Sequence, residues 1–234
     1  MAYKLETIRK MLTAANDYKA HYESVNITDI KPCISNGNTK IGRVLNVSLM
    51  PVMTCGNCKH CMGYCYDVKA CVRYPDTVID ARMRNTVLLQ RDRDLYFQYI
   101  IDKCARRRKN LFFRWHVAGD IIDADYLDRM VAIARMFPNF RFWTYTKMYS
   151  LVNEYVRTHG GNRETAIPSN LSIMFSEWSG TEMPNPYNFP TFACRLKAEA
   201  DKVMTGYHCT GNCDVCKANG CGCVVGQSSW IDEH

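Results

Sequence analysis

The sequence lacks an apolar run long enough to cross a bilayer. No run of about 18 or more apolar residues occurs, so no transmembrane helix is expected. The first residues, MAYKLETIRKMLTAAND, mix charges with apolar residues and lack the continuous apolar core of a signal peptide. Internal repeats and low-complexity segments are also absent. Together these absences predict a cytoplasmic protein with no membrane partner.

Cysteine, in contrast, is abundant. The chain has 13 cysteines, which in the cytoplasm are expected to be thiols and not disulfides. Most of them lie in two short windows. We call Cys55, Cys58, Cys61, Cys65 and Cys71 the first array, and Cys209, Cys213, Cys216, Cys221 and Cys223 the second array. Short spacers let several thiolates converge on one centre at little loop-closure cost, so both arrays are predicted to bind metal.

The hydrophobic pattern predicts an α/β fold. Strands are predicted over residues 44–50, 111–117, 140–146 and 171–178, and helices over residues 5–15, 77–91, 95–108, 127–137 and 149–157. Strands that alternate with helices and are almost continuously apolar are typical of parallel βαβ units. We therefore expect a full or partial (β/α) barrel over residues 37–190, preceded by a helix and loop (1–36) and followed by a cysteine-rich, metal-binding extension (191–234).

The first array directly follows a predicted strand. Active sites of α/β barrels lie in such loops, at the carboxyl ends of the strands. Cysteine thiolates select iron in iron–sulfur clusters or zinc. The spacing is tighter than the two separated CxxC knuckles common at zinc sites, which favours an iron–sulfur cluster. His60, inside the array, is interpreted as a neighbour of the metal and not as a ligand.

Several ordered motifs between residues 37 and 147 resemble a known family. They are Gly37-Asn38-Thr39-Lys40 with Gly42, TC-x5-C-x3-CY from Thr54 to Tyr66, Asn85, RWHVAGD from Arg114 to Asp120, and FRFWTYTK from Phe140 to Lys147. This pattern resembles the phage and mobile-element Gene product 88 family. The family itself resembles divergent radical-SAM-type barrels and has no established activity. Cys58 and Cys71 are additions to its pattern.

The resemblance implies a radical-SAM-type site. In such a site three cysteines hold a [4Fe-4S] cluster, whose open iron binds the amino and carboxylate groups of S-adenosylmethionine (SAM). Cys55, Cys61 and Cys65 would hold this catalytic cluster. Gly119 and Asp120, which follow the second barrel strand, would receive the SAM amino group.

The cysteine spacing of the first array departs from the radical-SAM pattern. The usual C-x3-C-x2-C spacing is missing from the first array and occurs instead at Cys209, Cys213 and Cys216. Because short spacings arise by chance in a cysteine-rich segment, we keep the predicted SAM site at the first array.

Further polar residues are predicted to surround the first array. Arg114, His116, Asp120 and Lys147 are the candidate catalytic residues, and Gly119, Asp120, Tyr66, Ser176 and Glu177 are the candidate cofactor-binding residues. Arg114 and His116 are expected on one face of their strand, by its period of two. A buried Arg114 needs either a carboxylate partner, Asp120 or Glu177, or an anionic ligand. Lys147 is either an anion ligand or a rim lysine.

The second array leaves its metal open. It fits a [4Fe-4S] cluster, and a structural zinc knuckle is the alternative. Two clusters would suit an electron relay, whereas convergence of both arrays would build one larger cluster.

The predicted function is that of an oxygen-sensitive iron–sulfur redox enzyme of radical-SAM-like type, with a redox partner and a small-molecule ligand or SAM. One alternative is a metal-stabilised nucleic-acid-binding or accessory protein of a phage or mobile element, suggested by the net charge of +7 and by Arg106–Lys109. That basic cluster also suits a helix C-terminus, where cations oppose the helix dipole. A non-catalytic electron carrier is the third reading.

Overall fold

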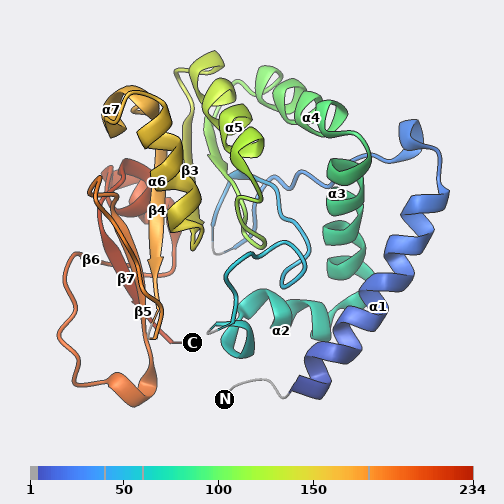
Figure 1. The fold of residues 1–234 in the computed structure, drawn as a ribbon, viewed down its shortest axis with the longest axis horizontal. Coiled ribbons are helices and arrows are strands. Elements are labelled where there is room, and N and C mark those ends of the chain that lie inside the picture. Colours follow the sequence, from blue (N-terminus) through green and yellow to red (C-terminus); the bar gives the residue numbers. More distant parts are fainter. Residues whose placement is uncertain (1–4, 40, 60, 179, 234) are drawn as a thin grey trace.

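The computed structural model describes residues 5–39, 41–59, 61–178 and 180–233, so Lys40 and His60 lie outside the described residues. A seven-stranded parallel sheet forms its centre, in the order β1-β2-β3-β4-β5-β7-β6, and curls into a half-barrel (Figure 1). The strands are β1 Leu45–Asn46, β2 Phe112–Arg114, β3 Arg141–Thr146, β4 Leu171–Glu177, β5 Thr191–Arg195, β6 Tyr207–His208 and β7 Ser229–Asp232. The predicted parallel α/β architecture and partial barrel are therefore confirmed.

Helices lie against both faces of the sheet. The α-helices are α1 Leu5–Ser24, α2 Tyr66–Arg73, α3 Asp80–Arg91, α4 Arg93–Ala105, α5 Ala124–Met136, α6 Tyr149–Thr158, α7 Arg163–Ala166 and α8 Cys213–Asn219, with 3-10 turns at Ile27–Asp29, Met62–Tyr64, Lys197–Glu199 and Gly222–Val225 and a π-helical turn at Pro75–Ile79. Helices α3 to α6 cover the outer face of the sheet, whereas α8 lies on the inner face. Phe113 and Phe142 of the sheet pack in one apolar core with residues of α1, α3, α4, α5 and α6. Helix α1 lies outside α3 (Figure 1). No helix of the described residues is long and apolar enough to span a membrane.

The fourth helix shows how local chemistry sets helix ends. Its N-cap is Asp92, whose side chain accepts a hydrogen bond from the Leu95 backbone N–H at 2.8 Å. The helix ends at Ala105, three residues before the predicted end. There the Arg108 guanidinium donates to the Ala105 carbonyl at 2.6 Å, which satisfies a carbonyl that the helix leaves without a partner.

The first two strands are shorter than predicted at their carboxyl ends. Beyond Asn46 and Arg114 the regular ladder gives way to bonds from the Val47 N–H to the Arg114 carbonyl (3.4 Å) and from the Leu49 N–H to the Ala118 carbonyl (2.9 Å). His116 has a φ of +52°, which breaks the alternation of a strand. Two irregular segments therefore lie together at the carboxyl edge, where the first array begins.

The chain after residue 190 completes the sheet. Three strands, β5, β6 and β7, lie there, and β5 pairs with β4 on one side and β7 on the other. The prediction of a separate cysteine-rich extension after residue 190 did not include these strands. They are too short to show a clear hydrophobic period in the sequence. The second array lies between β6 and β7 in the chain, and Cys216 and Cys223 pack on the inner face of the sheet with Trp143 and Met174.

Candidate metal centres at the carboxyl edge and the inner face

Four cysteines of the first array, Cys55, Cys58, Cys61 and Cys65, occupy the loop between β1 and α2, at the carboxyl edge of the sheet. Burial, with a smaller contribution from the charge of Asp120, raises the pKa of the Cys55 thiol to about 12. Cys58 and Cys65 lie within electrostatic reach of Cys55. Buried thiols of this kind stay protonated unless a cation takes the place of the proton. The location agrees with the sequence-based prediction.

Cys71, counted in the first array, has different surroundings. It is buried in α2, and its Sγ lies 4.0 Å from Asp67 Oδ2. Arg82 holds Asp67 with two hydrogen bonds, of 3.1 and 2.9 Å. The thiol thus adjoins a buried ion pair between α2 and α3, although Cys65 is within electrostatic reach.

Lys147 lies beside the first array. Its Nζ is 6.0 Å from the centre of the Trp178 ring, and its charge favours the thiolate of Cys58, although burial leaves the pKa of Cys58 raised overall. A surface pocket of about 520 Å³ borders the array here. Its lining residues are Gly56, Asn57, Lys147, Met148, Tyr149, Ser150, Leu151, Glu182 and Pro184. A cationic group and a cavity are therefore available next to the thiols.

Asp120 joins the ends of two strands. Its Oδ1 accepts from the Ile121 N–H at 2.7 Å, and its Oδ2 accepts from the Lys147 N–H at 3.0 Å. Burial raises the pKa of this carboxyl, while these hydrogen bonds oppose the rise. The Asp120 carboxylate therefore has a structural role that the sequence did not reveal. Binding of the SAM amino group by the same carboxylate stays a prediction.

The other predicted cofactor-binding residues reach the same edge but are engaged by the protein. The Tyr66 hydroxyl donates to the Val117 carbonyl, and the Ser176 carbonyl accepts from the Tyr149 hydroxyl. Glu177 lies 3.8 Å from the Lys202 ammonium at the surface. Gly119 has a φ of +88°, and a Cβ there would lie 2.8 Å from both Leu49 and Thr54. Gly119 thus permits close contact between the β1 and β2 loops, whereas binding of a cofactor by these residues stays a prediction.

The predicted pairing of Arg114 and His116 on one face is wrong. His116 is buried on the helix-covered side, where Nδ1 contacts Thr144 Oγ1 at 3.1 Å and Nε2 contacts the Tyr126 hydroxyl at 3.0 Å. Burial, helped by the charge of Arg114, lowers the pKa of His116 to about 3. The positive φ of His116 turns its side chain away from the face of Arg114. His116 is therefore a neutral bridge between β3 and α5.

Arg114 lies on the opposite, inner face. Its guanidinium carbon is 4.8 Å from the centre of the Tyr145 ring. Its buried Nε has no hydrogen-bond partner among the described residues, and no ion pair joins it to Asp120 or Glu177, the predicted partners. Cys213 and Cys223 of the second array lie within electrostatic reach instead. The sequence did not reveal this contact, because the two cysteines lie about one hundred residues after Arg114 in the chain.

The second array forms a thiol-rich layer on the inner face. The Tyr145 hydroxyl donates to Cys223 Sγ at 2.8 Å, and the Gly211 N–H donates to Cys209 Sγ at 3.4 Å. Cys209 and Cys213 are both within electrostatic reach of Cys223. On the other side of the layer, Cys216 Sγ is 3.8 Å from the Tyr207 hydroxyl. Neither Tyr145 nor Tyr207 was predicted as part of this site.

The donor groups of the two arrays indicate which kind of metal centre would suit them. Among the residues that the structure describes, no three His, Cys, Asp or Glu side chains are grouped so as to hold a metal ion. An iron–sulfur cluster places several atoms between its cysteine sulfurs, so its thiols stand farther apart than the ligands of one ion. The residues present fit such a cluster, because N–H and O–H groups donate to thiol sulfurs and the buried Nε–H of Arg114 has no acceptor among the described residues.

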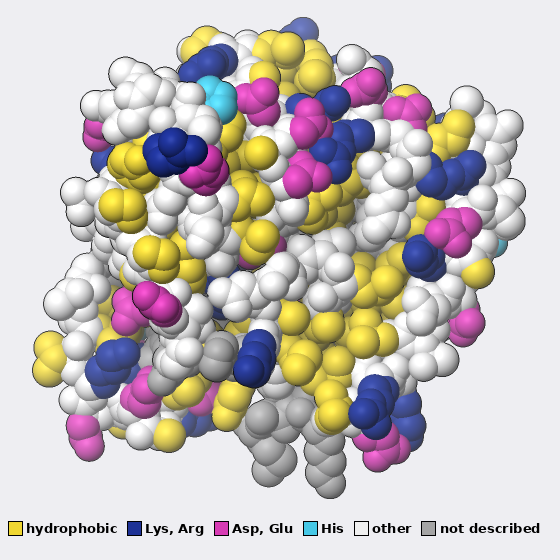
Figure 2. All heavy atoms as spheres, in the orientation of Figure 1, with side chains coloured by type: hydrophobic (Ala, Val, Ile, Leu, Met, Phe, Trp, Pro, Cys, Tyr) yellow, Lys and Arg dark blue, Asp and Glu magenta, His cyan; other side chains and the backbone are white. Residues whose placement is uncertain are grey.

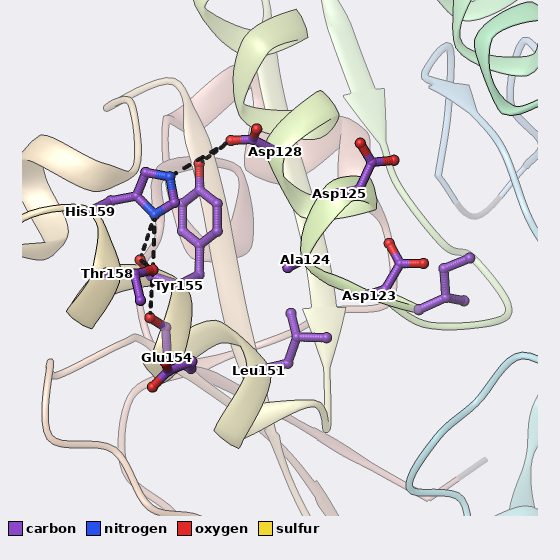
Figure 3. A pocket seen from close by; sticks show the side chains of 10 residues that line it. Asp123, Ala124, Asp125, Asp128, Leu151, Glu154, Tyr155, Thr158 and His159 are labelled. Atoms are coloured by element: carbon purple, nitrogen blue, oxygen red, sulfur yellow. Dashed lines mark hydrogen bonds and ion pairs between the residues drawn. The ribbon is translucent and has the colours of Figure 1, made fainter.

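A second pocket of about 520 Å³ lies between α5 and α6 (Figure 3). It is rich in carboxylates, but Arg93 donates to both Asp123 (2.9 Å) and Asp125 (2.7 Å). Asp128 accepts from the Tyr155 hydroxyl at 2.8 Å, and the His159 ring stacks on the Tyr155 ring (Figure 3). These side chains are engaged with one another, so the pocket offers no further candidate chemistry.

The basic cluster Arg106–Lys109 forms part of a helix end. Arg107 donates to the Lys109 carbonyl at 2.9 Å, Arg108 donates to the Ala105 carbonyl, and Arg106 lies 3.9 Å from Asp102. In Figure 2 acidic and basic side chains are interspersed on the face shown. Arg108 thus caps the helix, whereas Arg107 bonds loop groups and Arg106 pairs within the helix, and these described contacts give no specific support for nucleic-acid binding.

A family model described as Gene product 88 matches residues 24–187, more than two thirds of the 234-residue chain. The chain belongs to the Gene product 88 family. This is a phage-type family, as the sequence motifs indicated. No curated protein and no solved structure matched the chain.

The Gene product 88 match covers only one of the two arrays. It includes the first array, Asp120, Lys147 and β1 to β4, and it ends before β5. The second array lies outside the matched residues, although its segment packs on strands of the matched region.

Proposed function

We propose that this Gene product 88 protein is an iron–sulfur redox protein whose chemistry takes place at the carboxyl edge of the half-barrel. The observation that carries the proposal is the position of Cys55, Cys58, Cys61 and Cys65 in the loop after β1, beside Asp120 and Lys147 and next to a pocket. Parallel α/β sheets place their reactive groups at this edge. A cluster there would supply single electrons to a ligand in the pocket.

The residues around the pocket suit a ligand with both an anionic and a cationic group. The Lys147 ammonium can hold a carboxylate, and Asp120 keeps acceptor capacity beyond its two backbone hydrogen bonds. SAM carries both kinds of group, so a radical-SAM-like reaction is the finer form of the proposal. A partner that delivers electrons to the protein is part of it.

Metal analysis tests the coarser proposal. Anaerobically purified protein should contain about eight irons and eight sulfides per chain if each array holds a cubane cluster. The Cys55→Ser/Cys61→Ser/Cys65→Ser variant should lose about half of both, because it removes ligands of the first array alone. Cys104→Ser is the matched control, since Cys104 is a buried thiol of α4 outside both arrays. Stoichiometric zinc without sulfide in the parent protein would refute the proposal.

A product assay tests the finer form. With dithionite and SAM, the anaerobic protein should release 5′-deoxyadenosine, and Lys147→Ala should weaken SAM binding by about tenfold or more, the effect of losing one charged hydrogen bond. Lys10→Ala is the control, because Lys10 is exposed on α1 and pairs there with Glu6, outside the predicted site. If the iron-loaded protein neither binds SAM nor forms this product, the radical-SAM version is excluded.

A further inference from the structure

Two buried donors on the inner face have no acceptor within the part of the chain that the structure describes. Arg114 and Trp143 are register partners on β2 and β3, and neither Arg114 Nε nor Trp143 Nε1 has a hydrogen-bond partner among the described residues. Leaving a buried donor without a partner costs about 1–3 kcal/mol, and more for a charged group. An anion close to Arg114 would therefore stabilise the folded protein.

The nearest candidates for that anion are the sulfurs of the second array. Cys213 and Cys223 are within electrostatic reach of the Arg114 guanidinium. The Tyr145 ring, which lies 4.8 Å below that guanidinium, carries the hydroxyl that donates to Cys223. Arg114, Tyr145 and two thiols of a distant segment thus form one contact group on the inner face.

This group lies against an apolar core, and among the described residues the ion pair of Lys217 and Asp214 is the other charged feature within electrostatic reach of Cys213. Ile41, Val44, Trp143, Met174 and Val224 form one buried core with Cys216 and Cys223. In such a medium a charge interacts more strongly than in water, and an unpaired cation is costly. A negatively charged centre bound by the thiols would offset this cost.

We propose that Cys209, Cys213 and Cys223, with one of Cys216 and Cys221, hold a second iron–sulfur cluster on the inner face, and that Arg114 donates its Nε–H to this cluster and raises its reduction potential. The inference rests on the proposed iron–sulfur function. Arg114 acts as a positioning and tuning residue. Because one-electron reduction adds a negative charge to the cluster, the nearby guanidinium stabilises the reduced state more than the oxidised one.

The second cluster can be studied alone in the Cys55→Ser/Cys61→Ser/Cys65→Ser background. There its midpoint potential is measured by EPR during an anaerobic titration with dithionite and mediators. Arg114→Gln removes the charge, Arg114→Lys keeps it, and Arg141→Gln is the matched control, since Arg141 is exposed at the start of β3. Arg114→Gln should disfavour reduction at least tenfold, a fall of about 59 mV for one electron. Arg114→Lys should show a smaller fall, and Arg141→Gln should show none.

Each outcome bears on the inference. Loss of iron in Arg114→Gln but not in Arg114→Lys would also support a requirement for the charge. An unchanged potential in Arg114→Gln, or loss of iron in both Arg114 variants, would overturn the tuning role. If the background variant holds no iron and sulfide while the parent holds about four of each, the second cluster is disproved and the first stands. If the background variant keeps all the iron and sulfide of the parent, the first cluster is disproved and the second stands.

Discussion

Individual side chains at the ends of β1 to β4 combine structural and candidate chemical roles. Asp120 holds the N–H of Lys147 in place, and the same Lys147 carries the cation beside Cys58. His116, two residues from Arg114, instead joins Tyr126 and Thr144 on the other side of the sheet. The residue types were recognisable from the sequence, but the direction of the His116 side chain depended on its backbone φ of +52°.

Replacement of His116 by Phe should lower the free energy of unfolding by about 1–3 kcal/mol at pH 7, because the Thr144 and Tyr126 hydroxyls lose their hydrogen bonds to the imidazole. The lowered pKa of His116 contributes stability above its ordinary value of 6.5 that is lost as the pH falls toward about 3. His116→Phe should therefore lose less stability over that range. Urea unfolding at several pH values measures both effects.

His21→Phe is the control for this variant, since His21 is exposed on α1 and should leave the unfolding free energy almost unchanged. A His116→Phe variant as stable as the parent at pH 7 would show that the two hydrogen bonds contribute nothing to stability.

At the scale of elements, the loops after β1 and β2 are held together by close contacts. Gly119 lets the β2 loop approach Leu49 and Thr54. From the other side Asn85 of α3 accepts from the Cys33 N–H at 2.7 Å and donates to the Ser48 carbonyl at 2.8 Å. Because Asn85 belongs to the family motif, the sequence marked it as significant. Its role in joining two loops became visible only in the fold.

Gly119→Ala should be more destabilising than Gly160→Ala. Both glycines have positive φ, +88° and +97°, but a Cβ at Gly160 meets nothing within 4 Å. Backbone strain alone should cost about 1–2 kcal/mol at Gly160, and the steric overlap at Gly119 should add about 1–3 kcal/mol. Chemical denaturation of both variants gives the difference.

Iron content supplies a second readout for the same pair. Gly119→Ala should also bind less iron at the first array, because Thr54 directly precedes Cys55. Equal stability of the two variants would argue against a tight contact between the loops.

At the scale of the molecule, the segment after residue 190 both extends the sheet and fills its inner face. It supplies β5, β6 and β7 and brings the second array against Trp143 and Met174. Buried thiols also occur elsewhere in the chain. Burial is the leading cause that raises the pKa of Cys55, Cys71, Cys104 and Cys216 to about 12 and that of Cys223 to about 11.

The metal-free, reduced protein should therefore lose stability at alkaline pH. A raised thiol pKa contributes stability that is fully present below the ordinary value of 9.0 and is lost as the pH rises through about 11 to 12. The thermal midpoint of chelator-treated protein should fall above pH 9. Metal-loaded protein should fall less, because its ligating thiols are already deprotonated. A flat profile for the metal-free protein would contradict the burial of these thiols.

The sequence by itself determined the parallel α/β fold, the family and the place of the first array, because a continuously apolar strand followed by cysteines is a local pattern. It also indicated Asp120 and Lys147, each of which follows a strand. Only the tertiary structure decided that β5, β6 and β7 complete the sheet, that His116 and Arg114 face opposite sides, and that Arg114 meets the second array. The physical reason is that these features depend on packing between segments far apart in the chain, which no local period encodes.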